Sequence, residues 1–508
     1  MMRDKQKTGL NSRAAGSLSA SYNPITEGVI WKQILFFFFP MLLSSFFQQL
    51  YNTADALIVG RIAGKEALSA VGGSAGSVLG IFMMFYVGFA GGAAVLAAQY
   101  FGAKKEAATQ AAVRTSLKIS CLLGLCGTLI CLVFAGSILR VMHTPADVMV
   151  PSLVYLRIVA LGMIPNALYN MGASSLRAVG DARRPLYVLI FTCLCNIGLD
   201  LFFVAGLRMG AAGAALATIL CQLLSAVLVL ICLRQFILSA KNPEAATDTS
   251  VLSGEAPSAA PAEKENPQAS AAGEGTSGTD SAGAVSRRTA SSRDIPVRIL
   301  KMGLPLGFTE VMYTFANVVL MAAINSFGTD TVAAYAAYGK IDAIFWMIVG
   351  SFGISITTFV GQNMGAGKWG RVRQSIRDCA VMMFTALGLV IAALFLFARP
   401  LQGLFCTDPE VIEIGVRMMR FLMPFYVLYI PIEVLFGALR GMGNALAPTL
   451  LTFFGVCVLR SAWGIWIVPL HHTVNMVLTG FPVTWIVTSI AFGIYYHWYI
   501  RRLLPKQA

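Results

Sequence analysis

The sequence predicts an all-α polytopic membrane protein with twelve transmembrane helices in two pseudo-symmetric six-helix lobes. The 508-residue chain is 57% hydrophobic and only 12% charged, and its mean hydropathy of +0.71 is well above that of a soluble domain. Apolar segments of about 20 residues, each long enough to cross a bilayer, recur along nearly the whole chain. The two halves of the chain also share sequence motifs.

Twelve apolar segments are the predicted membrane spans. They are residues 34–59, 67–98, 115–138, 149–171, 185–206, 211–236, 299–325, 331–361, 378–398, 412–437, 446–470 and 477–500. Residues 241–294 are rich in Ala, Ser, Gly, Pro and Glu and have too few large apolar side chains to form a core, which predicts a disordered tether. The predicted organisation is a tail (1–33), an N-lobe (34–236), a linker (237–298), a C-lobe (299–500) and a second tail (501–508).

The net charge of +14 reports membrane topology. Lys and Arg concentrate in alternate loops, for example at Lys104 and Lys105, at Arg183 and Arg184, and at the C-terminal end of the chain. This asymmetry follows the positive-inside rule, so we expect both termini and the linker in the cytoplasm and the chain in the inner membrane. We expect no nucleic-acid binding from this basicity.

The two halves are related by an internal duplication. The segment "SSLRAVGDARRP" (174–185) aligns with "GALRGMGNALAP" (437–448), and "AQYFGAKK" (98–105) aligns with "GQNMGAGK" (361–368), both at an offset of 263 residues. Because each half has an even number of spans, the repeat is parallel and encloses a central cavity suited to alternating access. Arg177 and Arg440 of the shared motif are predicted to lie at the cytoplasmic boundary with a structural role.

Carboxylates at bilayer depth are costly and therefore mark functional candidates. In the first half, Asp55 follows Gln48 by seven residues, two turns along one helix face, and Asn196 and Asp200 share a face at i and i+4. Thr218 adds a hydroxyl from the next helix. We predict that these five side chains converge on a coupling ion: a hard cation prefers oxygen ligands, whereas a proton site needs a carboxyl whose neutral form is favoured by desolvation or a second carboxylate. The alternative is that Asp55 only hydrogen-bonds a neighbouring helix.

The second half holds the acids Glu310, Asp342 and Glu433, with Lys340 and Arg460 nearby in the sequence. We place Glu310, Lys340, Asp342 and Glu433 in a substrate cavity or C-lobe network. In it, Lys340 is predicted to neutralise Glu310 or Glu433. Arg460 either joins this network or extends its charge to the membrane surface.

The sequence contains no catalytic or nucleotide-binding motif that would explain the buried charges. No GxxxxGK[ST] phosphate loop or HExxH motif is present, so we expect neither ATP-driven transport nor an enzyme. The ten cysteines form no disulfide framework or CxxC metal spacing. No cofactor is expected apart from Na⁺ or H⁺.

Several motifs resemble the multidrug and toxic compound extrusion (MATE) family. They are "PMLLSSFFQQLYNTADALIVGRIAGKEALSAVG" (40–72), "GAAVLAAQYFGAKK" (92–105), "NIGLDLFFVAGLRMGAAGAALAT" (196–218) and "LRGMGN" (439–444). The resemblance implies a V-shaped pair of six-helix lobes and a cation site in the N-lobe, at positions matching Asp55, Gln48, Asn196, Asp200 and Thr218. In the C-lobe the family pattern departs, because Tyr313 and Tyr429 occupy the positions where some members carry acids.

The resulting prediction is a secondary active antiporter that exports amphipathic, mostly cationic organic compounds in exchange for Na⁺ or H⁺. With Na⁺ as the coupling ion, Asp55 and Asp200 would bind the metal. We expect a monomer whose partners are small organic cations and membrane lipids. The alternative is a lipid-linked oligosaccharide flippase or polysaccharide exporter of a related fold. An ion channel is disfavoured because the two halves differ too much in charge to form a continuous polar ring.

Overall fold

The computed structural model describes residues 23–239 and 294–503, and this part of the chain is built from helices without a strand. Most of the predicted linker and of both tails lies outside the described residues. The described ends of the predicted linker, residues 237–239 and 295–298, continue helices of the two lobes.

The first half forms one bundle, preceded by the short helix α1 (Pro24–Glu27). The bundle contains α2 (Ile30–Ile58), the π-helical η1 (Val59–Ala63), α3 (Gly64–Gly72), α4 (Ser74–Gly102), α5 (Glu106–Val141), α6 (Ala146–Leu161), α7 (Met163–Ala178), α8 (Arg183–Asp200), the π-helical η2 (Leu201–Gly206) and α9 (Gly210–Ser239).

The second half forms the other bundle. It contains α11 (Ile295–Asn325), α12 (Thr329–Gly365), α13 (Trp369–Leu396), α14 (Ala398–Gly403), α15 (Pro409–Leu422), the 3₁₀-helical η4 (Met423–Tyr429), α16 (Ile430–Gly441), α17 (Leu446–Thr452), η5 (Phe453–Val458), α18 (Leu459–Ala462), η6 (Trp463–Ile467), η7 (Val468–Leu470) and α19 (Val474–Leu503).

The described helices account for twelve membrane spans. Eleven are long and apolar enough to cross a membrane by themselves, and the twelfth is the pair α6 and α7, which bends by 48° between Leu161 and Met163. Each of the twelve overlaps one predicted segment, so the predicted fold class is confirmed.

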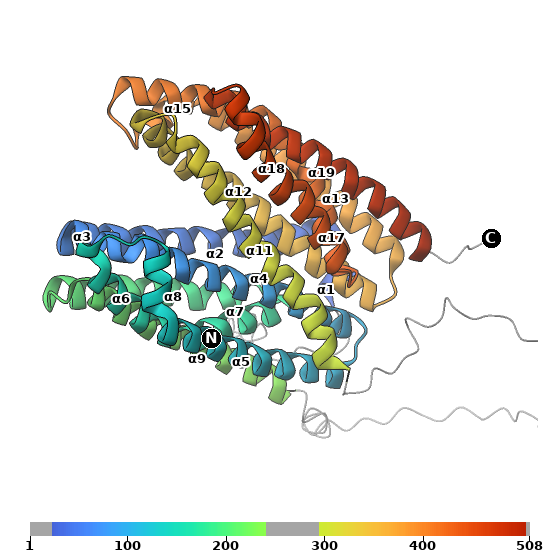
Figure 1. The fold of residues 1–508 in the computed structure, drawn as a ribbon. Coiled ribbons are helices and arrows are strands. Elements are labelled where there is room, and N and C mark those ends of the chain that lie inside the picture. Colours follow the sequence, from blue (N-terminus) through green and yellow to red (C-terminus); the bar gives the residue numbers. More distant parts are fainter. Residues whose placement is uncertain (1–22, 240–293, 504–508) are drawn as a thin grey trace, which may run out of the picture.

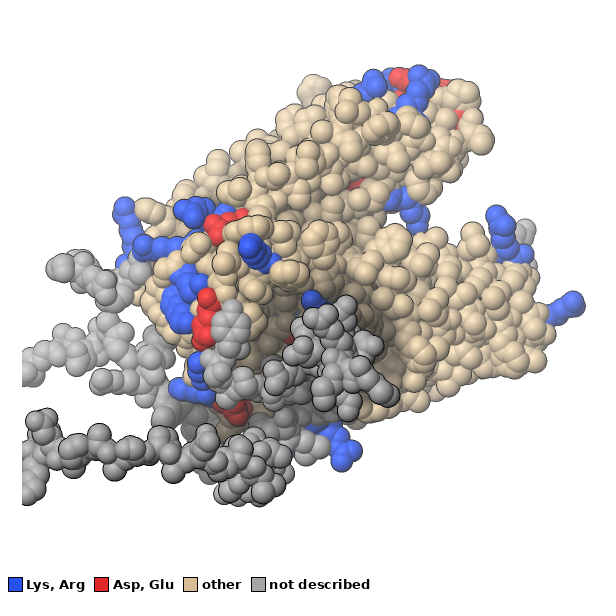
Figure 2. Space-filling view, turned by 180° about the vertical axis from the view of Figure 1, so that it is seen from behind, with Lys and Arg blue, Asp and Glu red and all other residues tan. Residues whose placement is uncertain are grey.

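The two bundles form a V (Figure 1). They converge at the end where α1 lies and the described helices lead into the tails and the linker, and they diverge at the other end. Lys and Arg side chains gather around the converged end, with smaller groups at the tips of the bundles (Figure 2).

Close packing of α4 against the first half of α11 joins the lobes. A Cβ atom at Gly88 would lie 2.5 Å from the carbonyl oxygen of Leu306, and one at Gly92 would lie 2.4 Å from that of Met302. Such distances leave no room for a side chain, so glycine is required at both positions for the helices to approach this closely.

The motifs shared by the two halves contact each other at the converged end. Gln99 Nε2 donates to the carbonyl oxygen of Gly441 at 2.9 Å, and Gln362 Nε2 donates to that of Ala178 at 2.7 Å. The two glutamines are 263 residues apart, and so are Ala178 and Gly441, whose carbonyl oxygens accept the hydrogen bonds. This separation equals the repeat offset. Each half therefore binds the Leu-Arg-x-x-Gly turn of the other, and we call this pair of contacts the glutamine clamp.

Two further glycines bring the helix ends of the glutamine clamp together. A Cβ at Gly102 would lie 1.9 Å from the carbonyl oxygen of Gln362, and a Cβ at Gly365 would lie 1.8 Å from that of Gln99. Backbone atoms cannot yield as a flexible side chain can, so any larger residue must separate the ends of α4 and α12.

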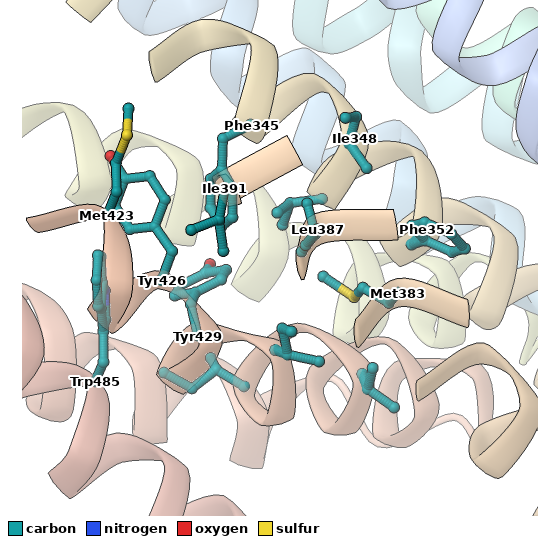
Figure 3. Close-up of a cluster of buried hydrophobic side chains, with 14 of the residues drawn as sticks. Phe345, Ile348, Phe352, Met383, Leu387, Ile391, Met423, Tyr426, Tyr429 and Trp485 are labelled. Carbon is teal, nitrogen blue, oxygen red and sulfur yellow. The ribbon is translucent and has the colours of Figure 1, made fainter. Parts of the chain in front are cut away.

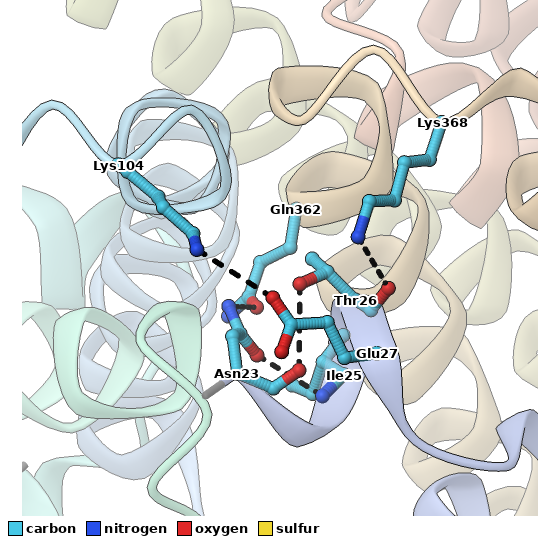
Figure 4. Close-up of polar contacts among 7 residues, drawn as sticks. All are labelled: Asn23, Ile25, Thr26, Glu27, Lys104, Gln362 and Lys368. Atoms are coloured by element: carbon cyan, nitrogen blue, oxygen red, sulfur yellow. Dashed lines mark hydrogen bonds and ion pairs between the residues drawn. The ribbon is translucent and has the colours of Figure 1, made fainter. Parts of the chain in front are cut away.

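The segment around α1 lies beside Gln362 of the glutamine clamp and contacts both lobes (Figure 4). Its partners are residues of α12 and of the loops that follow α4 and α12. The contacts are Asn23 Nδ2 to Gln362 Oε1 at 3.0 Å, Lys368 Nζ to the Thr26 carbonyl at 3.0 Å, and an ion pair of Lys104 with Glu27 at 3.6 Å. Ile25 of α1 is only 5% exposed, so this segment packs onto the converged end.

We predict that Gly102→Ala or Gly365→Ala separates the lobes at the converged end, because the added methyl group meets backbone atoms of the other helix. Double electron–electron resonance between spin labels at Glu106→Cys and Arg373→Cys, one on each lobe, will show a longer and broader distance distribution than in the parent protein.

The matched control is Gly370→Ala, at a glycine with open space around it. The labelling background replaces the exposed Cys121 and Cys126. An unchanged distribution in both glycine variants would mean that the contacts at Gly102 and Gly365 do not hold the converged end closed.

Candidate functional site

Four of the five side chains predicted for the coupling ion lie together inside the N-lobe. Asp55 comes from α2, Asn196 and Asp200 from α8, and Thr218 from α9, and α8 packs against both other helices. Asn196 and Asp200 are 0% exposed, Thr218 is 7% exposed, and Asp55 is half-buried. The spacing of Asn196 and Asp200 places both on the face that the neighbouring helices cover.

Electrostatic contacts and a hydrogen bond connect Asp55, Asp200 and Thr218 with two tyrosines. Asp55 and Asp200 lie close enough for their negative charges to repel each other. Tyr155 of α6 faces both carboxylates, and the Tyr51 hydroxyl is hydrogen-bonded with Thr218 while it also faces Asp55. The pocket therefore combines two acids, an amide, a hydroxyl and two tyrosines.

Several polar atoms of this pocket are buried without a hydrogen-bond partner among the described residues. They are Asp55 Oδ1, both carboxylate oxygens of Asp200, and both terminal side-chain atoms of Asn196. A buried acceptor without a partner is costly, and four of these five atoms are oxygens. The donor set fits Na⁺, which would be held by the two carboxylates with the Asn196 and Thr218 oxygens, and it equally fits a proton on one carboxylate.

The pocket differs from a transition-metal site. Within residues 23–239 and 294–503, no group of three or more His, Cys, Asp or Glu side chains is placed to hold a metal ion. The ligands available here are hard oxygens on three helices, which suits an alkali cation better than zinc.

Gln48 does not lie with the buried group, contrary to the predicted convergence. Its side chain is exposed on α2, whereas Asp200 and Asn196 are enclosed. Seven residues return to the same helix face but advance about 10 Å along the axis, which is too far for both Gln48 and Asp55 to reach one ion. Tyr51 is the missed member on α2: at four residues before Asp55 it shares the face and lies one turn away.

Irregular helical turns accompany the pocket. The π-helical η2 begins directly after Asp200, and η1 begins four residues after Asp55. Such turns locally change the direction in which side chains point and are frequent at functional sites. Tyr155, by contrast, reaches the pocket from α6 without a sequence signal that would have identified it.

In the C-lobe, Arg440 rather than Lys340 is the positive partner of the buried acids. Arg440 interacts electrostatically with both Glu310 and Glu433. Its Nη2 donates to Thr357 Oγ1 at 2.7 Å and to the Gly353 carbonyl oxygen at 3.2 Å. The Arg440 side chain thus points inward to the acids rather than outward to lipid headgroups, because two buried carboxylates attract it more strongly than the interface does.

Lys340 has no part in that cluster. Its side chain is exposed on α12, and none of the four ion pairs found among the described residues includes it. The predicted neutralisation of Glu310 or Glu433 by Lys340 is therefore wrong in this structure, since membership of one bundle does not bring the lysine to the acids.

Asp342 and Arg460 occupy separate polar positions in the C-lobe. Asp342 accepts a hydrogen bond from Trp346 Nε1 at 2.8 Å and another from the Tyr426 hydroxyl. Tyr426 belongs to the buried cluster of aromatic and aliphatic side chains in Figure 3. Arg460 is 5% exposed, donates to Thr484 Oγ1 at 3.2 Å and lies 4.3 Å from the centre of the Phe481 ring, so it does not reach the membrane surface.

A cavity of about 820 Å³ lies in the cleft between the lobes. Helices α2 and α12 supply most of its walls. Its lining is apolar except for Gln49, Thr53 and Lys340, and it does not include Glu310, Asp342 or Glu433. The volume and the apolar walls suit a drug-sized amphipathic molecule.

We predict that Arg440→Met destabilises the protein, because it leaves Glu310 and Glu433 facing each other without their cation. The expected loss is up to about 3 kcal/mol, visible as a lower unfolding temperature in detergent. The control is Arg177→Met at the equivalent position of the N-lobe, where the arginine donates to Ser174 Oγ at 2.8 Å and does not interact with an acid.

The second substitution Glu433→Gln in the Arg440→Met protein will restore part of the lost stability. Equal effects of Arg440→Met and Arg177→Met, without restoration, would contradict an electrostatic role for Arg440.

Comparison with known proteins agrees with this architecture. The MatE family model matches residues 40–202 and 305–466, once in each half. The chain is similar to the probable multidrug resistance protein YoeA of Bacillus subtilis, with 25% identity over 92% of this chain and 93% of the relative. It is also 24% identical to the probable multidrug resistance protein NorM of Thermotoga maritima over 87% of each chain.

The fold is also found among solved structures. One described as an outward-facing multidrug resistance MATE family transporter superposes with a TM-score of 0.76, at 22% identity, over 94% of this chain and 98% of that one. Together with the match of the family model to more than half of the sequence, these findings show that the chain belongs to the MatE family of multidrug and toxic compound extrusion proteins and is a multi-pass membrane transporter rather than an enzyme.

Proposed function

We propose that this transporter exports amphipathic, mostly cationic organic compounds in exchange for Na⁺ or H⁺. The observation that carries the proposal is the buried group of Asp55, Asn196, Asp200 and Thr218. In it, one oxygen of Asp55, both oxygens of Asp200 and the amide atoms of Asn196 are buried without a hydrogen-bond partner among the described residues. A membrane protein keeps such a costly group when an ion completes it during the transport cycle. The apolar cleft cavity supports amphipathic cargo.

Helix α2 provides the physical connection between ion and cargo. Tyr51 and Asp55 face the ion pocket, whereas Leu50 and Thr53 of the same turns line the cleft cavity. An ion or proton bound to the pocket removes the repulsion between Asp55 and Asp200 and lets α2 move closer to α8. The same movement reshapes the cavity wall, so that the ion and the cargo stabilise different states of the lobe.

The V supplies the two states that exchange requires. We propose that the protein lies in the inner membrane, that the diverging end faces outward, and that the converged end, with its basic residues, faces the cytoplasm. Inward opening then requires rupture of the glutamine clamp and of the contacts of α1. The protein is proposed to act as a monomer, because each chain holds both lobes, the cavity and the ion pocket.

We predict that proteoliposomes containing the protein release ethidium under either an imposed Na⁺ gradient or an imposed pH gradient. Asp55→Asn will slow this efflux by about tenfold or more, because an amide neither takes up a proton nor supplies the negative charge for Na⁺. The matched control is Asp330→Asn, at an exposed acid on the first turn of α12. Wild-type rates in Asp55→Asn would refute the proposed coupling.

A second prediction separates the two ions. If Na⁺ couples transport, exchange of choline for Na⁺ will raise the unfolding temperature of the purified protein, since a ligand that binds only the folded state adds about 2.7 kcal/mol at 100 times its Kd. Asp200→Asn will abolish this increase, and Asp147→Asn, at an exposed acid of α6, will keep it. If only protons couple transport, Na⁺ will not change the unfolding temperature of the wild type or of any variant. An increase in unfolding temperature that persists in Asp200→Asn would exclude this pocket as the Na⁺ site.

A further inference from the structure

Lys340 is the single charged side chain among the residues that line the cleft cavity. It lies on α12 opposite the α2 wall, and its neighbours along α12 in the lining are Ala343, Ile344 and Met347. Its side chain is exposed to this space rather than covered by protein. An ammonium group among apolar walls at membrane depth is costly unless something compensates it.

The acids closest in sequence do not provide that compensation. Asp342 is two residues away, which places it on a different face of the helix, and both of its oxygens are engaged by Trp346 and Tyr426. Glu310 and Glu433 face Arg440. The ion pairs of the described residues leave Lys340 without an acidic partner.

We propose that the cavity binds amphipathic molecules that carry an anionic group, such as a carboxylate, sulfonate or phosphate, and that this group pairs with Lys340. The apolar part of the ligand lies against α2 and α12, where Phe39, Phe46 and Met347 offer adaptable contacts. Gln49 and Thr53, one turn apart on α2, offer hydrogen bonds beside it. The inference rests on the proposed export function and adds amphiphiles with an anionic group, including zwitterions, to the cargo that this cavity binds.

The physical reason is the sign of the charge at low dielectric. Away from bulk water, opposite charges at contact distance attract several times more strongly than they do in water, and like charges repel equally. A cargo with only a positive charge would meet Lys340 without a compensating acid in the cavity lining. A cargo whose cation is accompanied by a carboxylate satisfies the lysine and keeps an organic cation among the transported compounds.

The test uses two dyes that differ by one methyl group: zwitterionic tetramethylrhodamine and its cationic methyl ester. Binding to the full chain in phosphatidylcholine nanodiscs is followed by fluorescence anisotropy, with empty nanodiscs subtracted. Lys340→Met will weaken binding of the zwitterion by about tenfold and leave the ester unchanged or bound more tightly. Lys340→Arg will retain the preference. Lys118→Met, at an exposed lysine of α5 outside the lining, will behave as wild type.

The source of the anionic group is distinguished in phosphatidylglycerol nanodiscs. Competition there that disappears in Lys340→Met shows that a lipid headgroup pairs with the lysine, whereas zwitterion binding that is equal in both lipids shows a preference for the soluble compound. Either result supports an anion-pairing role. Equal weakening of both dyes by Lys340→Met, or equal binding of both dyes to wild type, overturns it.

The outcome is separable from the export proposal. Binding is measured without a gradient, so a protein that fails to couple efflux to Na⁺ or H⁺ can still show the preference for the zwitterion. Conversely, if ethidium efflux depends on Asp55 while dye binding is unchanged in Lys340→Met, the export function stays in place and only this inference is removed.

Discussion

The close contact between the lobes at glycine positions is the constraint on which the rest of the structure depends. In a bilayer the helices gain little from the hydrophobic effect, so association relies on van der Waals contact and on hydrogen bonds across the interface. Gly88 and Gly92 let α4 touch α11, and Gly102 and Gly365 let α4 touch α12. Only at this distance do Gln99 and Gln362 reach backbone carbonyls of the opposite half, and the diverging cleft follows from convergence at one end.

The two lobes share one fold but differ in whether their buried acids have partners. The N-lobe leaves Asp55 and Asp200 without hydrogen-bond partners for some of their oxygens, whereas the C-lobe gives Asp342 two donors and sets Arg440 beside Glu310 and Glu433. An acid that is already satisfied gains little from an added cation. The duplication therefore yields one lobe with buried oxygens that lack partners, which we propose as the ion site, and one lobe whose acids are paired with its own side chains.

Two helices that face each other across the cleft, α2 and α12, supply most of the cavity walls. Helix α2 presents one face to the ion pocket and another to the cavity, and α12 turns Lys340 to the cavity while Asp342 points to the aromatic cluster. Because residues two apart on a helix point in different directions, a small rotation of either helix changes both environments together. In the proposed exchange, the ion and the cargo would therefore be coupled directly through these two helices.

The sequence predicts the twelve spans, the duplication and the acids at bilayer depth, because a membrane span requires a long apolar segment in which every charged residue stands out. It also brought together Asn196 and Asp200, since i and i+4 spacing defines one helix face. Which residue lies opposite that face depends on how the helices pack in three dimensions. Helical spacing carries no information on the rotation of neighbouring helices, and so it could not show that Arg440 faces Glu310 and Glu433, that Lys340 faces the cavity, or that Gln48 stays outside the pocket.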